Sequence, residues 1–102
     1  MKYITAIDVD EIGSKRDAEF QRRYAPKEKR LILEYFRRFH PYILTSAPAE
    51  DPFTHERVEE ADFGYSDGEY TWYETEIYCF EKYDLALTDE FLAYIRKKLN
   101  MG

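Results

Sequence analysis

The chain has 102 residues, of which 44% are hydrophobic and 18% aromatic, so it is long enough for one folded domain with its own core. Ten tyrosines and seven phenylalanines exclude a disordered chain, because disordered segments contain few aromatic residues. A net charge of −6 argues against binding to a nucleic-acid backbone, which depends on lysine and arginine. We therefore expect a single domain spanning residues 1–102.

The charge is uneven along the chain. Residues 1–40 contain ten lysines and arginines against seven acids, whereas residues 41–102 contain five against fourteen. Two interpretations stay open. The two parts neutralise each other within the fold, or the acidic part faces a basic partner protein.

The cysteine count and the hydropathy of the sequence indicate where in the cell the protein is expected. The single cysteine, Cys79, excludes an intramolecular disulfide and a cysteine zinc cluster, and it suits a cytoplasmic location. The apolar run in residues 1–10 is interrupted by Asp8 and is too short for a signal peptide. No apolar run approaches the length of a membrane span, so we expect no membrane contact.

The first part of the chain predicts one strand or turn and two helices. Residues 3–9 suit a short strand, although a helical turn also fits. Ser14 and Asp17 have a capping spacing ahead of a helix over 15–24. Pro26 opens a second helix over 26–39, whose apolar stripe is Leu31, Ile32, Tyr35, Phe36 and Phe39.

The middle of the chain predicts short strands. Residues 42–46 indicate a strand, 47–56 form a loop or the connection of a hairpin, and a second strand near 57–63 fits. The Asp67-Gly68 pair is typical of a tight hairpin turn and predicts pairing of 62–65 with 69–72.

Two helices are predicted near the end of the sequence. Thr71 and Glu74 have the spacing of a capping box for a helix over 72–83, with Tyr73, Ile77 and Phe80 on its core face and Cys79 packed as a small residue. Tyr70 and Tyr78 are the rings expected in solvent. Thr88 caps a last helix with an apolar stripe of Phe91, Leu92, Ile95 and Leu99. The fold class is α+β, with three to four helices and a small antiparallel sheet or hairpin.

No motif for catalysis or metal binding emerges. Residues 8–19 partly match a calcium loop, but Ile12 and Lys15 occupy positions that need other residue types. His40 and His55 are isolated, and no hydrolase or nucleotide-binding motif is present. We predict no catalytic residue, no metal site and no cofactor. The carboxylate pairs Asp67/Glu69 and Glu74/Glu76 keep open an alternative, a small carboxylate-based enzyme or metal-binding protein.

The run D-G-x-Y-x-W at 67–72, followed by I-Y-x-F-E-K-Y-x-L at 77–85, resembles a group of small uncharacterised bacterial proteins. The segment EDPFTHERV at 50–58 fits the same resemblance. Small acidic bacterial proteins of this size include immunity proteins that block a toxin. The resemblance therefore implies an inhibitor that binds a basic protein, and it assigns no catalytic residue.

The sequence as a whole predicts a non-enzymatic protein-interaction module with an acidic surface over residues 50–76 and a basic protein as partner. A homodimer that hides part of its rings is a further possibility. The predicted contact residues combine acids that steer association with exposed rings that anchor it: Glu59, Glu60, Asp62, Tyr65, Asp67, Glu69, Tyr70 and Trp72.

Overall fold

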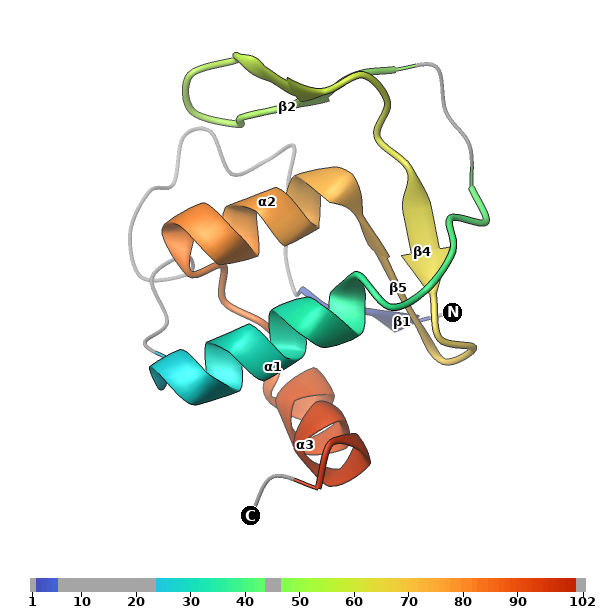
Figure 1. The fold of residues 1–102 in the computed structure, drawn as a ribbon, viewed down its shortest axis with the longest axis vertical. Coiled ribbons are helices and arrows are strands. Elements are labelled where there is room, and N and C mark those ends of the chain that lie inside the picture. The colour runs from blue at the N-terminus through green and yellow to red at the C-terminus, as the bar shows by residue number, and fades with distance from the viewer. Residues whose placement is uncertain (1, 6–23, 44–46, 101–102) are drawn as a thin grey trace.

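The computed structural model describes residues 2–5, 24–43 and 47–100, and these form an α+β fold (Figure 1). The described residues contain three helices, a sheet of three strands and a sheet of two strands. The predicted helix over 15–24 and the calcium-like segment 8–19 lie almost entirely outside them.

The larger sheet contains β1 (Lys2–Tyr3), β4 (Gly64–Ser66) and β5 (Tyr70–Tyr73), in the order β1-β5-β4. β4 and β5 form the antiparallel hairpin predicted around Asp67-Gly68, but residues 64–66 pair with 71–73 rather than 62–65 with 69–72. In that turn Asp67 Oδ1 accepts the backbone N–H groups of Glu69 and Tyr70, and Gly68 has a φ of 103°, which favours glycine. β1 pairs with β5 in parallel, so the sheet is mixed rather than purely antiparallel.

The smaller sheet is an antiparallel hairpin of β2 (Ala49–Glu50) and β3 (Arg57–Glu59), which stands at the top of the view in Figure 1. It continues the edge of the larger sheet. Ile43 forms a bridge with Gly64, and the N–H of Asp62 donates to the carbonyl of Ala47 at 2.8 Å. A strand is predicted over 42–46. Among the described residues of that segment, 42–43, only Ile43 is in β structure, as the single bridge to Gly64.

The helices are α1 (Pro26–Phe36), α2 (Glu74–Tyr83) and α3 (Asp89–Lys98). The predicted starts of α1 at Pro26 and of α3 after the Thr88 cap are confirmed, since Thr88 Oγ1 accepts the N–H of Phe91. The predicted start of the helix at residue 72 is wrong by two residues. Glu76, rather than Glu74, accepts the N–H of the capping residue, Tyr73, at 3.0 Å, because β5 continues through residue 73.

The core is built mainly from rings, as expected. Trp72 on β5 lies 5.0 Å from Phe36 on α1 between ring centroids, and its indole N–H donates to the Phe36 carbonyl. Phe36 also contacts the rings of Phe80 on α2 and Phe91 on α3. All three helices therefore meet at one ring cluster on the inner face of the larger sheet, and α2 runs between α1 and the β2–β3 hairpin (Figure 1).

Candidate functional site

The three predicted anchor rings are buried, so the prediction that they are exposed is wrong. The exposed fraction is 0% for Trp72, 2% for Tyr70 and 9% for Tyr65. Side chains alternate across a strand, which places Tyr70 and Trp72 together on the inner face of β5. Tyr65 lies opposite Trp72 in the ladder and shares that face. All three rings stabilise the core instead of meeting a partner.

The predicted acids divide into exposed and structural ones. Glu59, Glu60 and Glu69 are exposed. Asp62 is half-buried and accepts the N–H of Thr75 in the first turn of α2. Glu69 belongs to the β4–β5 turn, well away from Glu59 and Glu60 on the β2–β3 hairpin (Figure 1), so these acids do not form one patch.

Asp67 is also structural. Its Oδ2 accepts the hydroxyl hydrogens of Tyr35 at 2.5 Å and Tyr94 at 2.6 Å. Burial alone would raise the pKa of Asp67, but these hydrogen bonds and those of two backbone N–H groups hold that pKa below its ordinary value. Asp67 thus ties the β4–β5 turn to α1 and α3.

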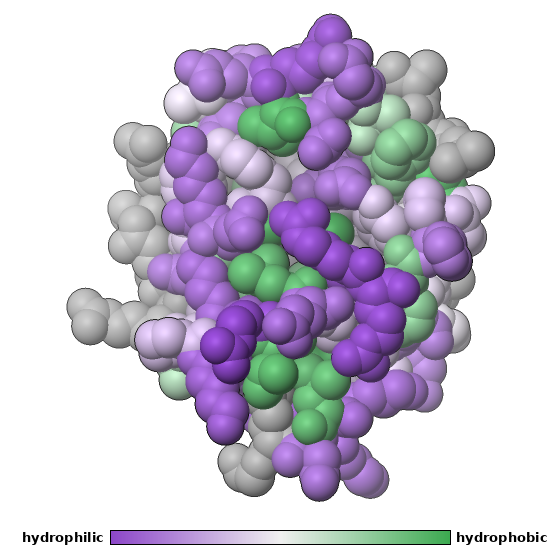
Figure 2. Space-filling model, viewed as in Figure 1, coloured by the Kyte–Doolittle hydropathy of each residue, from purple (hydrophilic) through white to green (hydrophobic). Residues whose placement is uncertain are grey.

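The strongest acidic surface of the described chain is the β2–β3 hairpin with its flanking residue. It presents four exposed glutamates: Glu50, Glu56, Glu59 and Glu60. Glu60 has a side chain that is 92% exposed and lies 3.7 Å from Arg57. Within residues 2–5, 24–43 and 47–100, no cation forms an ion pair with the other three glutamates. Figure 2 shows this end of the molecule covered by strongly hydrophilic residues.

Three of the described cations in the first forty residues pair with a different set of acids. Lys29 and Arg37 on α1 pair with Asp84 and Glu81 at the end of α2, at 2.5 and 3.6 Å. Lys2 pairs with Glu90 on α3 at 2.7 Å. Neutralisation within the fold therefore holds for part of the chain, whereas a basic partner for the acidic part stays a prediction. The helices exchange charge with each other, and the hairpin keeps its negative charge.

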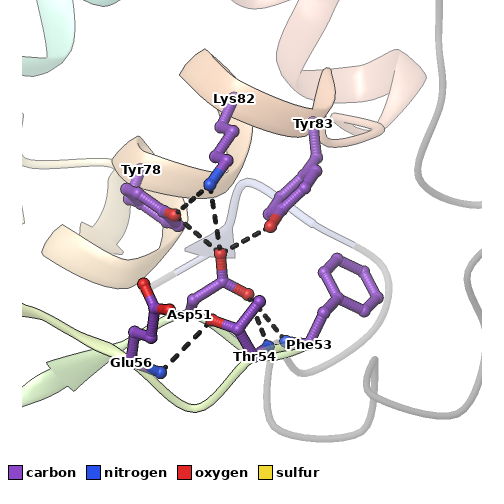
Figure 3. A network of polar contacts seen from close by, with 7 residues as sticks. All are labelled: Asp51, Phe53, Thr54, Glu56, Tyr78, Lys82 and Tyr83. Carbon is purple, nitrogen blue, oxygen red and sulfur yellow. Dashed lines mark hydrogen bonds and ion pairs between the residues drawn. The ribbon is translucent and has the colours of Figure 1, made fainter.

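A buried carboxylate, Asp51, fastens the acidic hairpin to α2 (Figure 3). Its exposed fraction is 1%. Its Oδ1 accepts the N–H groups of Phe53 and Thr54, which closes the turn between β2 and β3. Its Oδ2 accepts the hydroxyl hydrogens of Tyr78 at 2.6 Å and Tyr83 at 2.5 Å.

The Asp51 carboxylate stays charged in this position. Burial alone would raise its pKa, but the hydrogen bonds of Tyr78 and Tyr83 and of two backbone N–H groups lower it far below the ordinary value. The Lys82 ammonium lies 3.8 Å from Oδ2 and donates to the Tyr78 hydroxyl. In return, burial and the Asp51 carboxylate raise the pKa of Tyr78 and of Tyr83 to about 12.

Asp51 is the residue of the site that the sequence analysis missed. Its place ahead of Pro52 in a predicted turn favours a side chain that accepts from the backbone two and three residues on. The contacts with Tyr78 and Tyr83 join residues far apart in the sequence, and no local sequence pattern predicts them.

The arrangement does not favour the alternative of a carboxylate enzyme or metal protein. Three of the four acids in the candidate pairs accept hydrogen bonds within the fold: Asp67 as described above, Glu74 from the Tyr65 hydroxyl, and Glu76 from the Tyr73 N–H. The fourth, Glu69, is exposed. Among the described residues, no three side chains of histidine, cysteine, aspartate or glutamate gather as a metal site would need. The same part of the chain contains no helix with the length and hydropathy of a membrane span.

Comparison of the chain with protein families, with curated proteins and with solved structures finds no match. Its function is therefore argued from the hairpin and its anchor.

Proposed function

We propose that the protein is a non-enzymatic interaction module whose β2–β3 hairpin binds a basic surface of another protein. The observation that carries this proposal is the display of four exposed glutamates on a hairpin that a buried carboxylate locks in place.

Fixation of the hairpin favours binding because little conformational entropy is then lost when a partner docks. Asp51 closes the turn from one side and contacts two tyrosines of α2 from the other. The ring of Phe53, in the same turn, packs edge-on against Tyr83 at 4.8 Å between centroids. The backbone that carries the glutamates is thus held against the core.

The charge of the hairpin favours a cationic partner. Exposed charges of one sign raise the rate of association with a surface of the opposite sign, and they suppress contact with acidic surfaces. Among the hairpin acids, Arg57 offsets part of the charge of Glu60, and the other glutamates keep theirs. The specific form of the proposal is an inhibitor that covers a basic site of a toxin-like enzyme, in the cytoplasm where the thiol of Cys79 stays reduced.

The test uses the intact protein immobilised as bait for an extract of its own source cells. A retained basic protein is then purified, and its affinity is measured by calorimetry at low and high salt. We expect Glu50→Gln, Glu56→Gln and Glu59→Gln together to weaken binding by about tenfold or more and to flatten its salt dependence.

The matched control removes three acids elsewhere. Glu34→Gln, Glu81→Gln and Glu90→Gln change the net charge by the same amount but lie on the helices. This control should bind within about twofold of the wild type. Equal weakening by both triple variants would show a response to net charge alone, and equal affinity of all three proteins would remove the hairpin from the interface.

A further inference from the structure

The larger sheet has a second face that carries three tyrosines. Alternation along β5 turns Thr71 and Tyr73 to the side opposite Tyr70 and Trp72. Tyr3 on β1 is the register neighbour of Thr71, and the Tyr42 hydroxyl lies 3.3 Å from Thr71 Oγ1. We call Tyr3, Tyr42 and Tyr73 the tyrosine face.

These rings surround small residues and reach solvent. Tyr3 is 63% and Tyr42 50% exposed, and they are the exposed large hydrophobic side chains of the described residues. The ring of Tyr73 lies directly on Gly64, since a Cβ there would stand 2.9 Å from Tyr73 Cε1. The face thus presents the exposed rings of Tyr3 and Tyr42 beside the buried Thr71.

Carboxylates adjoin the tyrosine face. Glu76 Oε1 accepts the backbone N–H of Tyr73, and Asp62 Oδ1 accepts that of Thr75, both at 3.0 Å, so both acids lie near Tyr73. Burial raises the pKa of the Tyr73 hydroxyl, and Tyr42, Tyr3 and these two acids raise it further. Asp62 follows Glu59 and Glu60 in the sequence and is half-buried. Ring faces and carboxylates both attract a cation.

We propose that the tyrosine face receives an arginine side chain of the basic partner, which makes it the aromatic centre of an interface whose rim is the acidic hairpin. This inference rests on the proposed function. Arginine fits best because its planar guanidinium stacks on rings and donates to hydroxyl oxygens beside them. The fold already uses this contact, since the Arg38 guanidinium lies 5.3 Å from the Tyr35 ring centroid.

The probe for this site is a fluorescein-labelled peptide of six arginines, and its neutral counterpart contains six citrullines. Fluorescence anisotropy measures binding to the intact protein. We expect the arginine peptide to bind far more tightly than the citrulline peptide. Tyr3→Leu with Tyr42→Leu should weaken it by about tenfold, whereas Tyr3→Phe with Tyr42→Phe keeps the rings and should stay within about twofold.

The outcomes separate this inference from the hairpin proposal. Loss of binding in the glutamine variant of the hairpin, with full binding by the leucine variant, would overturn the tyrosine face and leave the hairpin standing. The opposite pattern would support the tyrosine face as the binding site and exclude the hairpin from the interface. Circular dichroism checks each fold, and Tyr3→Leu alone replaces the double variant if the latter unfolds.

Other results would also overturn the inference. In the peptide assay they are a citrulline peptide that binds as tightly as the arginine peptide, and an arginine peptide that does not bind. A further one is a wild-type dimer in light scattering that the leucine variant dissociates, because the tyrosine face would then contact a second copy of this chain.

Discussion

At the scale of single residues, two aspartates connect a hairpin turn to helices through the same set of hydrogen bonds. Asp51 and Asp67 each use Oδ1 to accept the N–H groups two and three residues later. Each uses Oδ2 to accept two tyrosine hydroxyl hydrogens from helices. One charged group thereby joins a hairpin turn to α2 in the case of Asp51, and to α1 and α3 in the case of Asp67.

Asp51→Asn should lower the free energy of unfolding by about 3 kcal/mol, because the amide N–H₂ group cannot accept the two tyrosine hydroxyl hydrogens. Urea denaturation at neutral pH measures the change. Glu59→Gln, an exposed neighbour, serves as control and should stay within about 0.5 kcal/mol. A loss below about 1 kcal/mol for Asp51→Asn would show that the tyrosine contacts contribute little.

Acid should destabilise the protein through the same two aspartates. Their pKa values are lower in the folded than in the unfolded chain, so the stability they contribute is present above about pH 4 and is lost as the pH falls towards the folded values. Urea midpoints measured from neutral pH down to about pH 2 should fall steadily. Asp51→Asn should show a shallower decline, and an equally steep one would contradict the assignment.

The Cys79 thiol should be unreactive in the native protein. It is fully buried in α2, and burial, reinforced by nearby carboxylates, raises its pKa to about 12. We expect a thiol reagent at neutral pH to label the native protein at least about a hundredfold more slowly than the urea-unfolded protein. Equal rates in both states would show that the helix opens readily around residue 79.

At the scale of elements, the stretch over residues 70–83 shows where sequence reasoning succeeded and where it stopped. The spacing of Tyr73, Ile77 and Phe80 predicted α2, and Thr88 predicted α3, because both signals are local. Ile77 and Phe80 do lie in the core, but Tyr73 belongs to β5. The strand over 70–73 was read partly as helix, since T-x-x-E mimics a cap. That shift of two residues placed Trp72 at the start of a helix, whereas it lies in β5 with its ring in the core.

Gly64→Ala should damage the junction of β4 with β5 and with Ile43. The added Cβ would lie 2.9 Å from both Ile43 Cβ and Tyr73 Cε1, closer than ordinary contacts, so the strands must shift. We expect a loss of about 1–3 kcal/mol in the free energy of unfolding, measured with urea.

Gly68→Ala is the comparison for that junction. Nothing surrounds its position, and its cost of about 1 kcal/mol would come from the φ of 103° alone. A Gly64→Ala protein as stable as the wild type would mean that β4 tolerates a side chain where the contact with Tyr73 now lies.

At the scale of the whole molecule, charge is separated along its length. The acidic hairpin stands at one end and α3, with Arg96, Lys97 and Lys98 in its last turn, at the other (Figure 1). The count of charges in the sequence predicted an imbalance. The position of the unbalanced charge on the surface depends on which acids the α1 lysines and arginines contact. Tertiary packing determines those contacts, so the sequence alone did not predict them.

Salt should therefore affect the fold and its proposed partner differently. The ion pairs between helices are at least partly exposed, so raising NaCl from about 0.05 M to about 0.5 M should change the free energy of unfolding by less than about 1 kcal/mol. The affinity of a partner held by the hairpin should fall steeply over the same range. A fold as salt-sensitive as the binding would show that the charge separation serves stability.

The parallel pairing of β1 with β5 has a consequence for biogenesis. Lys2 and Tyr3 leave the ribosome long before their ladder partners, Tyr70 and Thr71. The carbonyl of Ile4 likewise accepts a hydrogen bond from Thr88, which is synthesised much later. β1, which precedes the other described strands in the sequence, is thus expected to join the sheet after the β4–β5 hairpin and α2 have assembled from neighbouring sequence.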